Sequence, residues 1–369
     1  MDDLVKRIFA LVPGAGTPGS EDGAQGYGAG ASGSDSGAPV PGVGSPAPGF
    51  EELALEVFAF QFARNAVYRD FCQALGRSPG NVTSLEQVPF LPVELFRQHR
   101  VVAFEGQAEE EFVSSGTTAL GSQPEGAPAS RSRHFVKDLS VYEQSFSQSF
   151  RQFYGEPSGY CILALLPSYL EREGSSLVYM AASLIRQSGH PESGFYLDSY
   201  AKLAKVLRRL MGQGQRILLL GVSFGLLDLA EAHPMKMKNT LVMETGGMKG
   251  RRKEMVREEL HERLMETFSL DAIHSEYGMT ELLSQAWSKG GGWFGCPPWM
   301  RILIRDSNDP LSITDGRRTG GINVVDLANL HSCSFLATQD LGRIGAGGLF
   351  EVLGRFDHSD VRGCNLMLG

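Results

Sequence analysis

The stretch RILLLG, residues 216–221, is an apolar run that follows one arginine and ends in glycine. Two similar runs flank it in the chain, YCILALLP (160–167) and TLVMETGG (240–247). Short apolar runs bounded by Gly or Pro are typical of buried strands. Between and after them, residues 177–189 and 249–268 have apolar side chains at helical spacing. Strands that alternate with helices predict an α/β domain with a mostly parallel, helix-flanked sheet.

The pattern continues on both sides of these runs. Residues 50–75 and 138–155 have helical spacing, and VVAFE (101–105) and AIHSEYG (272–278) are predicted strands. From about residue 300 the chain changes to short strands separated by turns: MRILIRD, GGINVVDL, CSFLAT and GGLFEVLG. This second pattern predicts a smaller, antiparallel, barrel-like subdomain.

The N-terminal region is divided by a low-complexity tract. Residues 13–49 contain 12 Gly, 6 Pro and 5 Ser, too few apolar side chains to offset the entropy of ordering the chain. We therefore predict a short N-terminal helix over 1–12, a flexible linker over 13–49, the α/β core over 50–299, and the antiparallel subdomain with a mobile C-terminal tail over 300–369.

Composition excludes several classes of protein. The 369-residue chain has a net charge of −8, which does not suit a nucleic-acid partner. No apolar run approaches the roughly 18 residues of a membrane span, and the first residues, MDDLVKRIFALVPG, do not fit a secretory signal. The five cysteines form no metal or disulfide pattern, so we expect a cytoplasmic protein: Cys72, Cys161, Cys296, Cys333 and Cys364.

Small hydroxyl side chains and glycines follow two of the predicted strands, and ligands bind at the carboxyl ends of such strands. FVSSGTTALGS (112–122) places Ser and Thr around Gly116, which is either a surface turn or a cradle of N–H and hydroxyl donors for an anion. In ETGGMKG (244–250), Gly246 and Gly247 either form a simple turn or allow a flat ligand to lie against the backbone.

SEYGMTELLSQAW (275–287) offers an aromatic ring at Tyr277, a hydroxyl at Thr280 and a carboxylate at Glu281. A carboxylate here could cap a helix, or it could bind Mg²⁺ together with the phosphates of a substrate.

Two further acidic or basic positions lie near the C-terminal end. Asp340, in ATQDLGR (337–343), could accept hydrogen bonds from a ribose or could belong to a turn. LGRFDHSDVRGCNLM (353–367) contains Arg355 and Cys364 and could equally be a tight turn.

Taken in order, the motifs S-S-G-T-T, G-G, Y-G-x-T-E, T-x-D and G-R-x-D resemble the signature of the adenylate-forming enzymes, the superfamily of acyl-CoA synthetases and luciferases. The resemblance is closest to the LuxE-type acyl-protein synthetases, which are long-chain fatty acid protein ligases, and it covers roughly residues 50–369. It is carried by these segments: LALLPSYLEREGSSLVYM, METGGMKGRRKEMVREELH, SEYGMTELLSQAW, GINVVDLANLHSCSF and GRFDHSDVRGCNLM.

The resemblance implies a role for each motif in binding ATP. Gly246, Gly247 and Tyr277 surround the adenine. Thr280 faces the α-phosphate and Glu281 ligates Mg²⁺. Asp340 holds the ribose and Arg355 lies near the nucleotide. The β- and γ-phosphates are held by five residues of the first loop: Ser114, Ser115, Gly116, Thr117 and Thr118.

The resemblance also implies a reaction: ATP activates a fatty acid as an acyl-adenylate, and Cys364 then accepts the acyl group as a thioester. Such relatives pass the acyl group to an acyl reductase partner. Arg362, close to Cys364 in the chain, would lower the thiol pKa. The acid could be aliphatic or aromatic, and its chain length cannot be read from the motifs.

The sequence departs from the family pattern in two places. Ala119 replaces the usual glycine after S-S-G-T-T, and the loop that follows has no lysine, so its phosphate contacts would depend on Arg131, Arg133 or the backbone. We also expect no C-terminal lid domain with its catalytic lysine, as in the LuxE-type branch, because the chain ends twelve residues after Asp357.

A rival hypothesis is an esterase of the α/β-hydrolase type. GVSFG (221–225) matches G-x-S-x-G between a predicted strand and a predicted helix, the setting of a nucleophile elbow. Ser223 would be the nucleophile, with Asp271 or Asp326 and His331 completing the triad. A third alternative is a non-catalytic protein that binds a nucleotide or an acyl group.

Overall fold

The computed structural model describes residues 2–12, 47–114, 131–166, 174–246 and 255–356. Its first sheet has the strand order β5-β4-β6-β7-β8-β9. The strands from β5 to β8 are parallel to their neighbours, and only β9 runs antiparallel. The mostly parallel sheet predicted from the sequence is therefore confirmed. Its strands are β4 (Cys161–Leu165), β5 (Gly194–Phe195), β6 (Ile217–Gly221), β7 (Thr240–Glu244), β8 (His274–Tyr277) and β9 (Ala286–Ser288).

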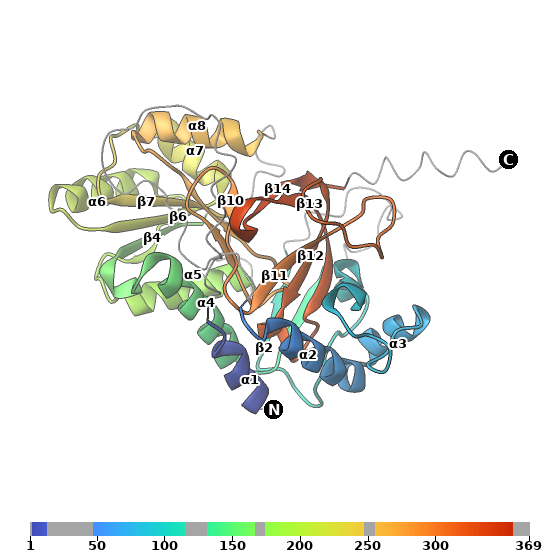
Figure 1. Cartoon of the computed structure of the whole chain (residues 1–369). Coiled ribbons are helices and arrows are strands. Elements are labelled where there is room, and N and C mark those ends of the chain that lie inside the picture. The colour runs from blue at the N-terminus through green and yellow to red at the C-terminus, as the bar shows by residue number, and fades with distance from the viewer. Residues whose placement is uncertain (1, 13–46, 115–130, 167–173, 247–254, 357–369) are drawn as a thin grey trace, which may run out of the picture.

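Helices cover both faces of this sheet (Figure 1). Alternate side chains of each strand point to opposite faces, so Ile162 and Leu218 pack into one core while Leu163 and Leu219 pack into another. The first core includes helices α4 and α5, and the second includes α6, α7 and α8. The helices are α4 (Leu139–Tyr154), α5 (Ser176–Ser188), α6 (Tyr200–Gly212), α7 (Ser223–Ala232) and α8 (Arg257–Phe268).

The second sheet is antiparallel along the order β10-β14-β13-β12-β11, and the short strand β1 (Leu91–Pro92) pairs in parallel with β13. Strands β1 and β10 come from before residue 300, so this sheet is not built from the C-terminal segment alone. Its other strands are β10 (Trp293–Phe294), β11 (Met300–Arg305), β12 (Gly320–Asp326), β13 (Phe335–Ile344) and β14 (Phe350–Arg355). A separate hairpin, β2 (Glu110–Val113) with β3 (Arg133–Val136), holds the two ends of the Ser/Thr-rich loop together.

One local prediction was wrong, and another was right in type but not in continuity. Residues 101–105 form no strand, because their backbone is bonded to the loop at 331–332 instead of to a ladder: Ala103 donates to the carbonyl of His331, and Val101 accepts from Ser332. The helical pattern over 50–75 is two helices, α2 (Phe50–Arg64) and α3 (Ala66–Ala74).

The break between α2 and α3 falls at Asn65, whose short amide bonds to backbone groups and competes with the helix. The Asn65 side chain accepts from the backbone N–H of Tyr68 and donates to the carbonyl of Ser332, both at 3.0 Å. It therefore begins α3 and also anchors both helices to the second sheet.

The N-terminal helix α1 (Asp2–Phe9) lies against this region (Figure 1). Ile8 is 1% exposed, the Phe9 ring meets the edge of Trp299 at 5.0 Å, and Arg7 forms an ion pair with Glu56 on α2. The helix is amphipathic, and its apolar side completes the core behind residues 327–329.

Ile8→Ala tests this packing. Removing a buried isoleucine leaves a cavity, and we expect the free energy of unfolding to fall by about 2–5 kcal/mol in urea denaturation. The matched control is Lys6→Ala on the exposed side of the same helix, which should stay within about 0.5 kcal/mol of the native protein. Equal effects of the two substitutions would contradict the docking of α1.

Candidate active site

A cavity of about 250 Å³ lies where the carboxyl ends of the parallel strands meet the second sheet. Residues from nine separate segments line it, including the base of the Ser/Thr-rich loop, the turn after β8, the middle of β13 and the end of β14. Its polar lining includes several residues selected from the sequence or their neighbours: Ser114, Arg131, Ser132, Thr245, Thr280, Glu281 and Arg355. Segments far apart in the chain therefore converge on one pocket.

Tyr277 and Asp340 form a buried contact beside this cavity, and the exposed Arg355 joins it from the surface. The Tyr277 hydroxyl donates to Oδ2 of Asp340 at 2.9 Å, and Nε of Arg355 donates to Oδ1 at 2.9 Å. Asp340 and Arg355 are direct partners in the β13–β14 ladder. Burial and the adjacent Asp340 carboxylate raise the pKa of Tyr277 well above its usual value, so the ring keeps its proton and remains a donor.

Glu281 is buried at the cavity wall, with 7% of its surface exposed. Burial raises the pKa of its carboxyl, while a hydrogen bond from Ser132 and the positive charges of Arg97 and Arg355 act in the opposite direction. An oxygen ligand at the edge of a polar cavity and close to cationic side chains suits a site that receives both a metal ion and phosphate groups.

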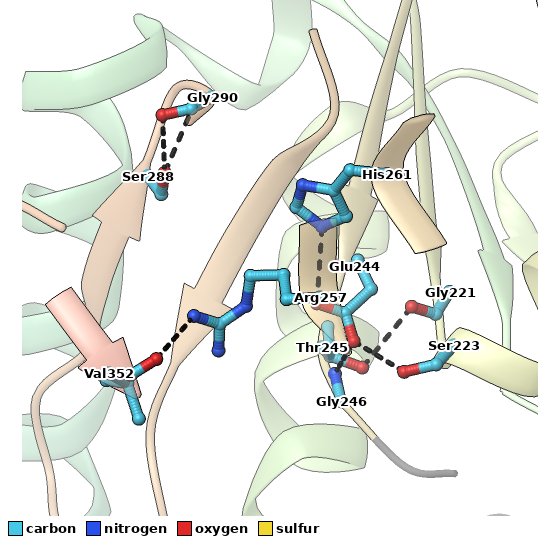
Figure 2. Close-up of polar contacts among 10 residues, drawn as sticks. All are labelled: Gly221, Ser223, Glu244, Thr245, Gly246, Arg257, His261, Ser288, Gly290 and Val352. Carbon is cyan, nitrogen blue, oxygen red and sulfur yellow. Dashed lines mark hydrogen bonds and ion pairs between the residues drawn. The ribbon is translucent and has the colours of Figure 1, made fainter. Parts of the chain in front are cut away.

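The turn after β7 is held by a buried carboxylate, Glu244 (Figure 2). Its Oε1 accepts the backbone N–H of Gly246 at 2.6 Å and the hydroxyl of Ser223 at 2.5 Å. Burial alone would raise the pKa of Glu244, but His261, Ser223 and the charge of Arg257 together lower it. Gly246 has a φ of 79°, a left-handed conformation that glycine adopts without strain.

The rival hydrolase hypothesis depends on Ser223. The strand–turn–helix setting exists, since β6 ends at Gly221 and α7 begins at Ser223. However, the hydroxyl is 2% exposed and bonds to Glu244, not to a histidine base. Asp326 accepts from Leu283 and Ser284 instead. These contacts do not form the nucleophile–base–acid order that such a triad requires.

The remaining partners proposed for that triad are also placed elsewhere. His331 meets the Phe104 ring edge-on with ring centroids 6.5 Å apart, and Asp271 is exposed on the loop after α8.

The structure brings together the selected residues that it describes. Ser114, Thr280, Glu281 and Arg355 line the cavity, Tyr277 and Asp340 join them through Arg355, and Gly246 follows the cavity residue Thr245. Arg131 lines the cavity too, whereas Arg133 pairs with Glu111 on the hairpin. Six selected residues lie outside the described part of the chain: Ser115, Gly116, Thr117, Thr118, Gly247 and Cys364.

Sequence reasoning missed three carboxyl groups in this region: Glu94, which lines the cavity, and the pair Glu244 and Glu276. Glu244 supports the Gly246 turn, and Glu276 lines the cavity. Burial, together with the neighbouring charge of Glu244, raises the pKa of Glu276 to about 8. Both are acids at the ends of predicted apolar strands, which is the signal that could have pointed to them.

No family model matches the chain. It is 23% identical over 348 residues to a long-chain-fatty-acid–luciferin-component ligase from Aliivibrio fischeri, covering 86% of this chain and 87% of the relative. A ligase of the same name from Photorhabdus luminescens is 32% identical over 74 residues, which is 20% of this chain and 63% of that relative. The resemblance to LuxE-type ligases is confirmed.

Solved structures agree with this relationship. The structure of 2-hydroxyisobutyryl-CoA ligase with its adenylate and CoA superposes with a TM-score of 0.58 at 14% identity, covering 85% of this chain and 71% of that one. ATP-bound MatB from Rhodopseudomonas palustris has a TM-score of 0.50 at 16% identity, covering 68% of this chain. The fold is that of the adenylate-forming ligases. The present chain spans about half the length of MatB, 49%.

Two further features are absent from the part of the chain that the structure describes. None of its helices is both long and apolar enough to cross a bilayer. Likewise, within the same ranges no three His, Cys, Asp or Glu side chains form a cluster that could hold a metal ion.

Glu276→Gln tests the electrostatics of the cavity. The pKa of Glu276 is about 8 in the folded protein against an ordinary value of 4.5, so folding holds a proton that the unfolded chain releases. The contribution of Glu276 to native stability therefore falls as pH rises from about 4.5 to 8, by up to about 1.4 kcal/mol per pH unit. Glutamine does not ionise. Over this pH range the unfolding free energy of the variant, measured in urea, should therefore rise relative to that of the native protein.

The control for this experiment is Glu262→Gln, an exposed carboxylate on α8. Its unfolding free energy should follow the native pH dependence. A constant difference between Glu276→Gln and the native protein at every pH would show that Glu276 is ionised normally.

Proposed function

We propose that the protein is a carboxylate-activating ligase, which uses ATP to convert a fatty acid into an acyl-adenylate and then transfers the acyl group to a cysteine. The observation that carries the proposal is the single cavity that unites Ser114, Thr280, Glu281 and Arg355 beside Tyr277 and Asp340. The fold of the adenylate-forming ligases and the similarity to two named ligases support it. Neither the fold nor the similarity to these ligases supports the hydrolase alternative.

In this proposal the nucleotide lies along the cavity. Asp340 would accept ribose hydroxyls, because each carboxylate oxygen has a second lone pair beyond the one used by Tyr277 or Arg355. Gly246 and Tyr277 would contact the adenine, with Gly247 beyond the described residues. Arg355 and Thr280 would face the α-phosphate, and Ser114 leads into the loop proposed for the β- and γ-phosphates.

Mg²⁺ fits the donor set of this cavity. Mg²⁺ commonly uses one or two carboxylates, with waters and substrate phosphates completing its octahedral shell. Glu281 provides one such carboxylate at the cavity wall, and no larger acidic cluster exists among the described residues. When bound, the ion would neutralise phosphate charge. The side chains then position the reactants: Thr280 and Arg355 orient the phosphates.

The chemistry needs little from the protein beyond positioning. A carboxylate oxygen of the acid attacks the α-phosphorus, the bond to the β-phosphate oxygen breaks, and pyrophosphate leaves. Cationic groups at the cavity, Arg131 and Arg355, oppose the charge that gathers there. Val113, Leu177 and Met180 give the cavity an apolar part that suits an acyl chain. We propose a fatty acid as the substrate, ATP with Mg²⁺ as the cofactors and an acyl reductase as the final acceptor.

The acyl-accepting thiol is proposed to be Cys364. All four cysteines in the described part of the chain are buried, and burial raises the pKa of each thiol, to about 12 for Cys72. A thiol with a raised pKa is a poor nucleophile because so little thiolate is present. Arg362 would favour the thiolate of Cys364, and the R-G-C sequence resembles that of LuxE-type synthetases.

Glu281→Gln tests the activation step. The substitution keeps the size of the side chain but removes the charge proposed to bind Mg²⁺, so fatty-acid-dependent exchange of pyrophosphate into ATP should fall by about 10²-fold or more. The exchange is measured with fatty acids of several chain lengths and with aromatic acids as substrates. Glu86→Gln, an exposed carboxylate, is the control and should exchange at the native rate. Native exchange in Glu281→Gln would remove Glu281 from the metal site.

Cys364→Ser tests the transfer step. After incubation with ATP, Mg²⁺ and fatty acid, intact-protein mass spectrometry should find an acyl adduct on the native chain that hydroxylamine removes. The adduct should vanish in Cys364→Ser while pyrophosphate exchange persists, because activation does not need the thiol. Cys72→Ser, a buried control, should keep the adduct. An undiminished adduct in Cys364→Ser would place the acceptor elsewhere.

A further inference from the structure

The peptide that carries Thr280 and Glu281 is supported from behind by two buried polar side chains, His134 and Asn329. His134 lies on β3 and is 1% exposed, and Asn329 ends the short helical turn η4 (Leu327–Asn329) and is fully buried. Neither side chain lines the cavity. Both instead contact backbone carbonyl oxygens of the Thr280–Glu281 segment.

The contacts from Asn329 use the whole amide group. Its Nδ2 donates to the carbonyl of Glu281 at 2.7 Å and to the carbonyl of Cys333 at 2.9 Å. Because both hydrogens of the amide are taken by carbonyls, Oδ1 is the atom that faces His134 Nε2, at 3.0 Å. Asn329 therefore links the Thr280–Glu281 segment to the second sheet.

The ring of His134 bridges Asn329 to Thr280. Its Nδ1 lies 2.8 Å from the carbonyl of Thr280, which can only accept a hydrogen bond. Burial lowers the pKa of His134 to about 4, so at neutral pH the ring has one N–H to donate. Both ring nitrogens therefore face oxygen acceptors, and the single hydrogen can serve only one of them. We assign it to Nδ1, which makes the shorter contact, so that Nε2 faces Asn329 Oδ1 without a hydrogen between them.

Strand β3 also joins this support to the Ser/Thr-rich loop. Ser132 lies directly before β3, two residues ahead of His134, and both side chains are buried. The backbone N–H of Ser132 donates to the hydroxyl of Ser114, and the backbone N–H of Ser114 donates to the carbonyl of Ser132, both at 3.0 Å. A side-chain hydrogen bond from Ser132 also acts to lower the pKa of the Glu281 carboxyl, against the effect of burial. Residues 132–134 thus contact both the base of the Ser/Thr-rich loop at Ser114 and the Thr280–Glu281 segment.

We propose that His134 is a positioning residue, which through its Nδ1–H bond to Thr280 holds the following Glu281 carboxylate in the orientation that a Mg²⁺-bound nucleotide requires. This inference rests on the proposed function, since it concerns the same site. It adds a residue that touches neither substrate nor metal. A histidine with a merely structural role would stabilise the fold without affecting how strongly Mg²⁺ promotes ATP binding.

Two variants separate the contacts of the ring. The amide of His134→Asn reaches the position of Nδ1 and can still donate to Thr280, whereas the longer His134→Gln reaches the position of Nε2 and bonds to Asn329 instead. Titration calorimetry measures ATP binding with Mg²⁺ and with EDTA. In His134→Gln the affinity for ATP in the presence of Mg²⁺ should fall about 10-fold or more, as is typical when a residue that orients a metal ligand is replaced. His134→Asn should keep it, and binding in EDTA should be unchanged in both.

The matched control is Asn65→Ala, which removes another buried amide that bonds to a carbonyl of the same region, that of Ser332. It should lower the unfolding temperature as His134→Gln does, yet leave the Mg²⁺ dependence of ATP binding intact. If His134→Gln also leaves that dependence intact, the positioning role is refuted. If the native protein binds no ATP under either condition, the proposed function itself fails.

A measurement on the native protein does not depend on whether a variant folds. In ¹⁵N-histidine-labelled protein, the His134 signals, assigned by their absence in His134→Asn or His134→Gln, should show a protonated Nδ1 and an unprotonated Nε2 at pH 7. A proton on Nε2 alone would mean that the ring donates to Asn329 and not to Thr280, which overturns the proposal.

Discussion

The contact of Tyr277 with Asp340 is the interaction on which the site depends. Tyr277 ends β8 of the parallel sheet and Asp340 lies in β13 of the antiparallel sheet, so one buried hydrogen bond of 2.9 Å joins an inner strand of each sheet. Apolar packing between sheets is not directional, whereas a buried donor and acceptor must meet with defined geometry or lose solvation without compensation. This bond therefore sets where the two walls of the cavity stand.

Buried polar groups extend this constraint behind the cavity. Asp326 accepts from the backbone of Leu283 and Ser284, and Asn329 donates to the carbonyl of Glu281. The residues that carry the proposed chemistry are thus attached to β12, η4 and β3 through main-chain contacts. A site held in this way loses little entropy when phosphates bind, which is the advantage of a preorganised arrangement of charges.

Much of the fold followed from local pattern, because apolar runs such as RILLLG, bounded by polar residues and glycine, are typical of strands that helices cover on both faces. The motif residues Thr280, Glu281 and Arg355 were likewise found in order along the chain. Local pattern failed where distant groups decide the outcome. Asn65 breaks a helical stretch by bonding to Ser332, far along the chain. The roles of His134 and Glu244 depend on partners that no spacing reveals.

The central claim is that the acid attacks the α-phosphate of ATP, and oxygen transfer tests it most directly. A fatty acid carrying ¹⁸O in its carboxylate is incubated with ATP, Mg²⁺ and the protein, followed by hydroxylamine to release the acyl group. The account predicts AMP that has gained one ¹⁸O atom, because the carboxylate oxygen stays on the α-phosphorus when the adenylate is cleaved. AMP without label, or label in inorganic phosphate, would contradict it.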